Sequence, residues 1–190
     1  MSSDILEHTD NDVRKWYVMS AYRQEKKAES ALSERGVRCF VPKRYAVKTL
    51  RGKKIRVLQP AVSNLVFVYA SWNEVIALKH PLDYLQFQTQ VVQQKRRVMV
   101  VPDDEMEQFI RVAEQLEADV CYYRVEELGA AEGQPVRVIG GNFNGVEGRL
   151  MKITGKRQKR VVIALESLLA VAITIENPEY LEVIKQQKSE

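Results

Sequence analysis

The chain has 190 residues, 45% of them hydrophobic, so it is long enough for one large or two small domains with a buried core. Its formal net charge is +4, its apolar runs are far shorter than the roughly 20 residues that span a bilayer, and its acidic first residues do not fit a secretory signal. Two cysteines and two histidines without metal-ligand spacing indicate a cytoplasmic protein with reduced thiols, no metal site and no cofactor.

Charge is distributed unevenly along the chain. Residues 35–56 contain nine Lys or Arg and no acid, and residues 149–160 contain six more, again without an acid. Residues 101–132 show the reverse, with ten acids against two Arg. Such segregation favours contact with an anionic surface such as nucleic acid, although two well-solvated basic loops are the simpler alternative.

The first half of the chain alternates between strand and helix signals. β-branched and aromatic residues mark the strands, good helix formers mark the helices, and a turn signal at residues 51–53 divides a basic stretch into a hairpin. In chain order, the expected elements are a strand at 15–20, a helix over 21–36, a strand at 37–42, a basic hairpin over 45–58, a central strand at 61–70, a short helix at 72–79, and strands at 84–87 and 98–101.

An amphipathic helix is expected to begin near Asp103, because apolar residues then recur at spacings of three and four. These residues are Met106, Phe109, Ile110, Ala113 and Leu116. We expect this helix to close an α+β domain over residues 13–118, an antiparallel sheet with flanking helices, after a disordered tail at residues 1–12.

The last third of the chain changes to a β pattern. Residues 119–132 are polar and acidic and predict a linker. Short strands are then expected at 136–138, 146–153, 161–165 and 169–175. Their spacing predicts a small all-β barrel over residues 133–185, followed by a polar tail at residues 186–190.

Glycines concentrate at the start of this β region. Gly140 and Gly145 have the spacing of a phosphate-binding loop, but Val146 and Glu147 stand where that loop requires Lys and Ser or Thr. A nucleotide site is therefore rejected. The stretch reads instead as a tight turn between two strands, with Asn144 tolerant of left-handed backbone.

Both halves of the chain resemble one protein family. The pattern Val-x-Val-x-Gly-Gly-x-Phe-x-Gly over residues 136–145 resembles the KOW motif of NusG-like transcription factors. Trp16-Tyr17 opening a strand, Phe40-Val41-Pro42, the basic hairpin and the stretch 64–68 resemble the NusG N-terminal domain in order and spacing. The resemblance covers residues 13–185 and implies that the C-terminal barrel is an SH3-like KOW domain.

The resemblance implies a surface for RNA polymerase. NusG-like N-terminal domains bind the clamp helices of the polymerase through an apolar depression on the sheet. On this chain the pocket positions fall on Val62, Leu65 and Phe67, of which two are aliphatic where the family has aromatic residues; Trp16 and Tyr17 are further candidates. The alternative is that these side chains face the helices as ordinary core.

The resemblance also suggests nucleic-acid contacts. Related factors touch the non-template DNA strand from the first helix, which here carries Arg23, Lys26 and Lys27; a solvated helix face is the alternative. The hairpin candidates are Lys48, Arg51, Lys53 and Lys54. In the barrel, the candidate binding loop comprises Gly141, Phe143 and Gly145, with Lys156 and Arg157 in a later turn.

These features together predict a non-enzymatic transcription elongation or antitermination factor that binds RNA polymerase and promotes processive transcription. Paired acids occur, but none stands with a His or a metal-ligand set. The KOW domain is expected to recruit a ribosomal protein or Rho, with non-template DNA or nascent RNA as further partners and no membrane contact. The variant Ser63-Asn64-Leu65 looks most like operon-specialised NusG paralogues such as the UpxY-like group. The alternative is a KOW-type RNA-binding or ribosome-associated protein that never meets polymerase.

Overall fold

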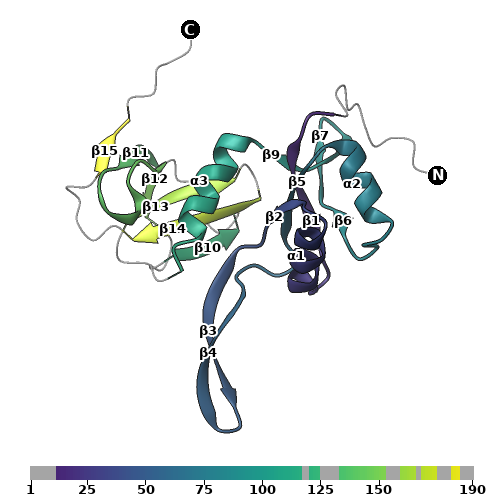
Figure 1. Ribbon diagram of the computed structural model, residues 1–190. Coiled ribbons are helices and arrows are strands. Elements are labelled where there is room, and N and C mark those ends of the chain that lie inside the picture. Colours follow the sequence, from purple (N-terminus) through teal and green to yellow (C-terminus); the bar gives the residue numbers. More distant parts are fainter. Residues whose placement is uncertain are drawn as a thin grey trace. The chain divides into compact units, whose positions relative to one another are not determined.

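The computed structural model describes residues 12–116, 120–124, 133–152, 159–165, 168–174 and 181–184. By its internal contacts the chain divides into two compact units, Met1–Asp103 and Asp104–Glu190 (Figure 1). This division assigns the helix that begins at Asp103 to the second unit, whereas the sequence had predicted a domain boundary near residue 118.

The N-terminal unit is built on an antiparallel sheet. Strand β1 pairs with β5 so that Trp16 lies opposite Tyr69 and Val18 lies opposite Phe67. Strands β2 and β6 extend the sheet on either side in the order β2-β5-β1-β6, and β9 also pairs with β1. The strands are β1 (Lys15–Ser20), β2 (Arg38–Phe40), β5 (Val66–Ala70), β6 (Gln86–Phe87) and β9 (Val100–Val101).

Two helices cover one face of this sheet. Helix α1 (Glu25–Glu34) begins four residues later than predicted, because Tyr22 and Arg23 adopt left-handed backbone with φ of 46° and 67°. Helix α2 (Trp72–Lys79) has the predicted bounds. It begins with a capping box, in which the Ser71 side chain accepts a hydrogen bond from the backbone of Glu74 and the Glu74 carboxylate accepts one from the backbone of Ser71.

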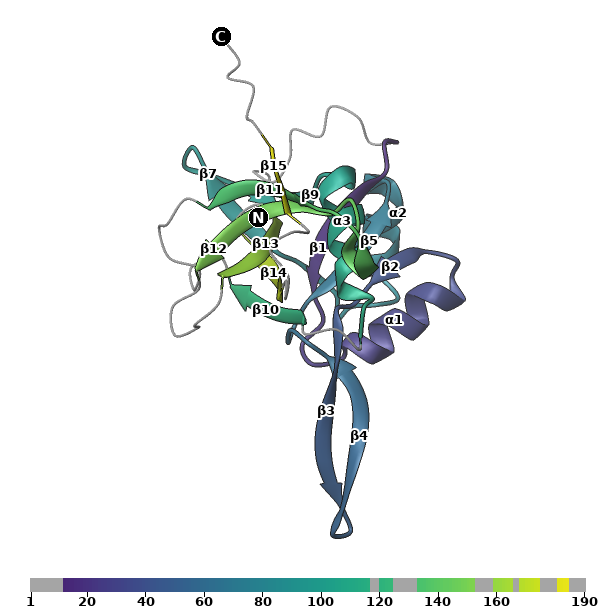
Figure 2. The same cartoon turned by 90° about the vertical axis from the view of Figure 1, so that its left-hand side faces the viewer.

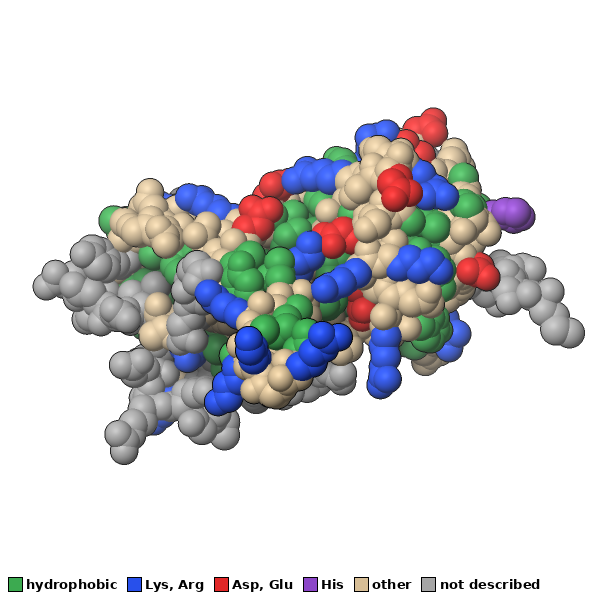
Figure 3. Space-filling view, turned by 60° about the horizontal axis from the view of Figure 1, so that its bottom comes forward, with side chains coloured by type: hydrophobic (Ala, Val, Ile, Leu, Met, Phe, Trp, Pro, Cys, Tyr) green, Lys and Arg blue, Asp and Glu red, His purple; other side chains and the backbone are tan. Residues whose placement is uncertain are grey.

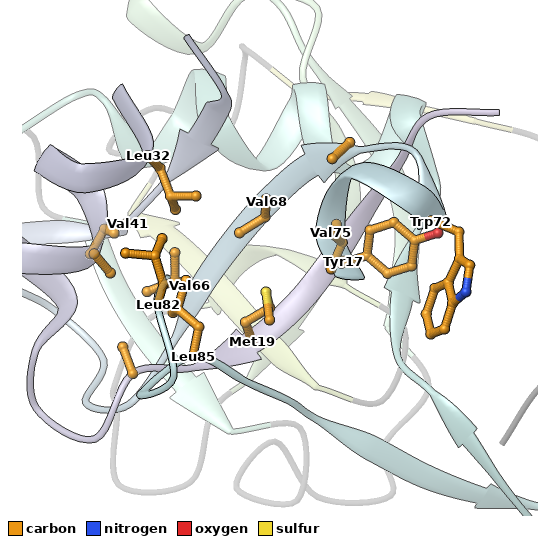
Figure 4. Close-up of a cluster of buried hydrophobic side chains, with 13 residues drawn as sticks. Tyr17, Met19, Leu32, Val41, Val66, Val68, Trp72, Val75, Leu82 and Leu85 are labelled. Carbon is orange, nitrogen blue, oxygen red and sulfur yellow. The ribbon is translucent and has the colours of Figure 1, made fainter. Parts of the chain in front are cut away.

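The core of the N-terminal unit lies between these helices and the sheet (Figure 4). Tyr17, Met19, Val66 and Val68 project from β1 and β5 into it and are at most 1% exposed. Because successive strand residues point to opposite faces, their neighbours Trp16, Val18 and Phe67 project from the other face of the sheet. Apolar side chains on both faces explain why β1 and β5 read as continuous hydrophobic runs.

Two hairpins extend from the N-terminal unit (Figures 1 and 2). The first pairs β3 (Lys43–Leu50) with β4 (Lys53–Pro60) and turns at Arg51-Gly52, as the sequence predicted. The second pairs β7 (Thr89–Val92) with β8 (Lys95–Val98) and was not predicted.

The C-terminal unit combines one helix with an antiparallel sheet. Helix α3 (Asp103–Ala113) buries Met106, Phe109 and Ala113 of the apolar face predicted for it. It also buries Val112, which was not part of that prediction, while Ile110 is half-buried. Six strands pair in the order β10-β14-β13-β12-β11-β15. They are β10 (Val120–Arg124), β11 (Gln134–Val138), β12 (Glu147–Lys152), β13 (Lys159–Leu165), β14 (Leu169–Thr174) and β15 (Leu181–Val183).

The predicted fold class is confirmed. The chain combines an N-terminal antiparallel sheet and flanking helices with an antiparallel C-terminal sheet. One expectation is corrected, because residues 120–124 form β10 and pair with β14 where the polar sequence had suggested only a linker. No helix in the described part of the chain is both long and apolar enough to cross a membrane.

Candidate functional site

Asn64 connects the loop before β5 to the turn before α1 through hydrogen bonds. Its side-chain oxygen accepts a hydrogen bond from the backbone N–H of Tyr22 at 2.7 Å, and its own backbone N–H donates to the carboxylate of Glu25 at 2.5 Å. The side chain of Gln88 donates to the Asn64 carbonyl oxygen at 3.1 Å. Asn64 itself is left-handed, with φ of 62°, like Tyr22 and Arg23. These hydrogen bonds therefore hold strained backbone in place on both sides of one surface.

An open depression of about 710 Å³ lies beside this junction, and we call it the basic depression. Its lining comes from the start of α1, the hairpin and the loop before β5: Arg23, Gln24, Glu25, Lys26, Lys27, Lys48, Gln59, Pro60 and Ser63. Four of these side chains are cationic, and the one carboxylate is already hydrogen-bonded to the backbone of Asn64. The fold thus joins Lys48 of the hairpin to the cations of the first helix, which the sequence had presented as separate groups.

The four cations differ in how they are held. Lys26 donates from Nζ to the carbonyl oxygen of Leu58 at 3.0 Å. Lys27 donates to the side chain of Gln24 at 3.3 Å, and its Nζ lies 4.5 Å from the centre of the Tyr84 ring. The side chains of Arg23 and Lys48 are exposed and make no hydrogen bond or ion pair with any residue that the structure describes. Two fixed and two unpaired cations around one depression suit the binding of an anion such as a phosphodiester.

The other predicted nucleic-acid residues lie at the end of the β3–β4 hairpin. Arg51, Lys53 and Lys54 are all exposed there. The hairpin lies at the bottom of Figure 1, and Figure 3, which brings that side forward, shows Lys and Arg side chains around apolar ones. Val47 and Leu50 of the hairpin are 69% and 59% exposed.

The predicted polymerase-binding residues fall on both faces of the sheet. Tyr17 lies in the core under the helices, where its ring centre is 5.9 Å from those of Trp72 and Phe87. Trp16 and Phe67 project from the opposite face and are 1% and 0% exposed. The structure therefore separates Tyr17 from the other candidates, a consequence of strand alternation that the sequence prediction did not apply to these two neighbours.

We call the face that carries Trp16 the aromatic sheet face. Trp16 and Tyr69 lie opposite each other in the register, with ring centres 5.1 Å apart, and the Arg38 guanidinium lies 5.0 Å from the Trp16 ring. Leu65, directly before β5, is 3% exposed, and Val62 is half-buried in the preceding loop. The indole N–H of Trp16 is buried and has no hydrogen-bond partner among the described residues.

In the C-terminal unit the glycine-rich stretch forms a turn between β11 and β12, as predicted. Gly141 and Gly145 adopt left-handed backbone with φ of 64° and 80°, and Gly145 N donates to the carbonyl oxygen of Val138 at 2.7 Å. Phe143 ends a short 3-10 turn and is half-buried. Arg111 of α3 donates to the carbonyl oxygen of Asn144. Lys156 and Arg157, the other candidates in this unit, lie outside the described residues.

Cys39 does not offer an activated nucleophile. Burial, together with the carboxylate of Glu29, raises the pKa of the Cys39 thiol, which disfavours the reactive thiolate. No group of three or more His, Cys, Asp or Glu in the described part of the chain could hold a metal ion.

Comparison with known proteins decides the family. A family model described as "Transcription termination factor nusG" matches residues 14–110, just over half of the chain. The chain belongs to the NusG family. Members of this family are non-enzymatic transcription factors that generally bind RNA polymerase.

Two individual proteins are also similar to this NusG-family chain. A segment of 75 residues is 35% identical to "DNA replication and repair protein RecF" of Heliobacterium modesticaldum, covering 40% of this chain. The chain spans about a fifth of that protein's length, since the match covers 19% of it. A solved structure described as "Domain interaction in Thermotoga maritima NusG" aligns at 18% identity and a TM-score of 0.45, over 91% of this chain and 98% of that one.

The structure also identifies residues that the sequence prediction missed. Asn64 and Glu25 hold the two loops at the rim of the basic depression, and Gln59 and Ser63 line it. The one local signal for Asn64 was its residue type, because Asn adopts left-handed backbone more readily than most residues. The lining by Gln59 and Ser63 depends on tertiary contacts and has no local signal.

Proposed function

We propose that the chain is a cytoplasmic transcription elongation or antitermination factor that binds RNA polymerase and holds a strand of nucleic acid in the basic depression. The observation that carries this proposal is the depression itself, where Arg23 and Lys48 lie unpaired beside two fixed cations in a member of the NusG family. Unpaired cations exchange water and counterions for phosphates with little loss of internal contacts. Processive transcription would follow from holding polymerase and nucleic acid together.

Polymerase binding is proposed for the aromatic sheet face and its margin. The indole N–H of Trp16 supports this, because a buried donor without a partner can gain a hydrogen bond from an acceptor on another protein. Leu65 and Phe67 would supply apolar contact, and Val62 lies in the loop at the margin. Their burial means that docking requires this face to become accessible. Tyr17, on the helix side, would support the sheet without touching the partner.

A pull-down of core RNA polymerase tests the docking proposal. Phe67 is unsuitable as a probe, because truncating a fully buried Phe costs about 3–5 kcal/mol and threatens the fold. Val62→Asp places a charge in the half-buried loop, and Ile76→Asp places one on α2, where Ile76 is 45% exposed. We expect capture by the wild type and by Ile76→Asp, and loss of capture with Val62→Asp. Failure of the wild type to capture polymerase would sink the proposal.

The C-terminal unit is proposed to recruit a second partner through the turn that carries Gly141, Phe143 and Gly145. A ribosomal protein or Rho fits a protein-binding turn of this kind, as does nascent RNA. The alternative function, RNA or ribosome binding without polymerase, would need aromatic side chains for base stacking. Phe143 is the aromatic residue of this turn and is half-buried, so polymerase binding is the better supported of the two.

Specialisation to particular operons is a further part of the proposal. Its support is the departure from the general family pattern at Val62, Ser63 and Leu65, next to Asn64. Ser63 lines the basic depression, so this variant loop would alter both the margin of the docking face and the site for nucleic acid. A recruiting sequence would then act through these positions.

A further inference from the structure

The β7–β8 hairpin carries a second group of unpaired cations. Lys95, Arg96 and Arg97 are consecutive and exposed, and their side chains make no hydrogen bond or ion pair with any described residue. Residues 84–102 contain no Asp or Glu, so the hairpin holds no acid of its own that could pair with them. Three adjacent like charges repel one another, and nothing within the hairpin offsets that repulsion.

The register distributes these charges over both faces of the two-stranded ribbon. Arg96 lies opposite Val91, and Lys95 and Arg97 lie opposite Val92 and Gln90. Because neighbouring strand residues alternate, Arg96 projects from one face and the other two cations project from the other. Val91, on the Arg96 face, is 72% exposed. A ribbon that is cationic on both faces suits a groove with phosphates along both walls.

The turn of this hairpin is held in a costly conformation. Gln93 and Gln94 both adopt left-handed backbone, with φ of 51° and 64°. Two-residue hairpin turns of this type strongly prefer Asn-Gly, and side chains such as Gln are disfavoured there. The two-residue turn places Lys95, Arg96 and Arg97 close to the tip of the hairpin. Strained backbone of this kind clusters at binding sites.

We propose that the β7–β8 hairpin is a binding site for duplex DNA, which it enters as a two-stranded ribbon in the major groove. The major groove of B-form DNA is about 12 Å wide and admits such a ribbon, with phosphates on either side for Arg96 and for Lys95 and Arg97. The major groove of duplex RNA is too narrow and deep for it. Single strands are bound by stacking on aromatic side chains, and residues 88–102 include none.

This site is separate from the basic depression, with which it shares no residue. The two hairpins that contribute to these sites leave different parts of the N-terminal unit, with β7 and the β3–β4 hairpin at opposite ends in Figures 1 and 2. The proposal therefore goes beyond the proposed function and does not depend on it, because DNA binding by the ribbon needs neither polymerase nor the depression.

Fluorescence anisotropy with the full chain tests the proposal. The probes are a DNA duplex of about two helical turns, an RNA duplex of equal length and a DNA single strand, each titrated over a range of salt concentrations. The variant Lys95→Gln/Arg96→Gln/Arg97→Gln removes the ribbon's charge. The control Arg35→Gln/Arg149→Gln/Lys152→Gln removes the same charge from other exposed positions.

We expect the ribbon variant to weaken duplex DNA binding and to reduce the slope of log K against log salt by about 2.7, which is about 0.9 for each phosphate that is no longer neutralised. The control triple should keep the wild-type slope. Four outcomes would each overturn the proposal. The ribbon variant could keep the wild-type slope, or the control triple could reduce the slope by the same amount. The ribbon variant could also reduce the slope equally on duplex RNA or the single strand, or the wild type could fail to bind duplex DNA.

Two further variants guard against a folding artefact. Arg96→Gln and Arg97→Gln alone should each reduce the slope by about 0.9. Gln93→Asn/Gln94→Gly leaves every cation in place and supplies the residues that the turn prefers, so it should bind duplex DNA like the wild type. Loss of binding in this last variant would contradict a role for the cations.

Discussion

Asn64 shows how one residue can decide the geometry of a binding surface. Its side chain and backbone bind Tyr22 and Glu25 from the start of α1, while Gln88 binds its carbonyl oxygen. Asn is among the few residues other than Gly that adopt left-handed backbone readily, and its φ is 62°. The same residue therefore satisfies a conformational demand and a hydrogen-bonding demand.

The two demands can be separated by substitution. Asn64→Ala should lower the free energy of unfolding by about 2 kcal/mol, roughly half from the missing side-chain hydrogen bond and half from the left-handed backbone. Asn64→Gly should lose only the hydrogen bond, about 1 kcal/mol. Urea unfolding of both variants measures the difference. Equal losses in Ala and Gly would show that backbone conformation contributes nothing at this position.

At the scale of elements, the start of α2 depends on a charged cap. The backbone N–H of Ser71, followed by Arg14, lowers the pKa of Glu74 below its ordinary value of 4.5. Arg14 also forms an ion pair with Glu74 at 2.7 Å. A carboxyl whose pKa falls on folding stabilises the folded state at pH values above its unfolded pKa, and this contribution is lost as pH falls through the folded pKa.

Glu74→Gln keeps an acceptor for the cap but removes the titration. We expect the wild type to be more stable than this variant at neutral pH, and the difference to shrink below pH 4.5, the ordinary pKa of the carboxyl. Urea unfolding at a series of pH values follows the difference. A difference that stays constant from about pH 6 to about pH 3 would mean that the charge of Glu74 does not stabilise the cap.

The turn of the β7–β8 hairpin gives a second prediction at this scale. Gln93→Asn/Gln94→Gly replaces two side chains that are disfavoured at positive φ with the pair that this turn prefers. Relief of the strain should raise the free energy of unfolding by about 1 kcal/mol, seen as a higher Tm. Gln90→Asn, on a strand of the same hairpin, serves as the control and should bring no gain. An unchanged Tm in the turn variant would show that the left-handed backbone of Gln93 and Gln94 does not destabilise the fold.

At the scale of the whole molecule, the net charge of +4 includes separate groups of cations whose side chains have no partner among the described residues, and two of these groups carry the proposals above. One lies at the basic depression with Arg23 and Lys48, and the other lies on the β7–β8 hairpin. The first group surrounds a concave site and the second projects on a ribbon, so they should prefer different forms of nucleic acid.

Paired measurements on single-stranded and duplex DNA test this division. Arg23→Gln/Lys48→Gln should reduce the salt slope on a single strand by about 1.4, or about 0.7 per phosphate, and leave duplex binding unchanged. The triple substitution at Lys95, Arg96 and Arg97 should do the reverse. Arg35→Gln/Lys152→Gln matches the charge change of the pair. Suppose Arg23→Gln/Lys48→Gln changed neither slope while the triple variant at Lys95, Arg96 and Arg97 acted as expected. The basic depression would then no longer be assigned as a single-strand site, and the hairpin proposal would stand.

The sequence by itself determined the elements that rest on local signals. Strand β1, helix α2 and the turn at Gly52 have the predicted positions, because strand propensity, a capping Ser and a glycine with positive φ act within a few residues. The amphipathic pattern likewise predicted α3. The family resemblance also came from the sequence alone, and the family match over residues 14–110 confirms it.

Tertiary structure alone decided the rest. Strand β10 is polar and aromatic by sequence and forms because β14, far along the chain, supplies its hydrogen bonds. Lys48 lines the basic depression because the β3–β4 hairpin leaves the sheet beside the start of α1, where Lys26 binds Leu58 of the hairpin. Helix α1 starts late because Asn64 holds the turn before it. These features depend on partners distant in sequence. Local propensity does not indicate which distant segment will pair with the backbone hydrogen-bonding groups of a strand or bring its charged side chains together with others.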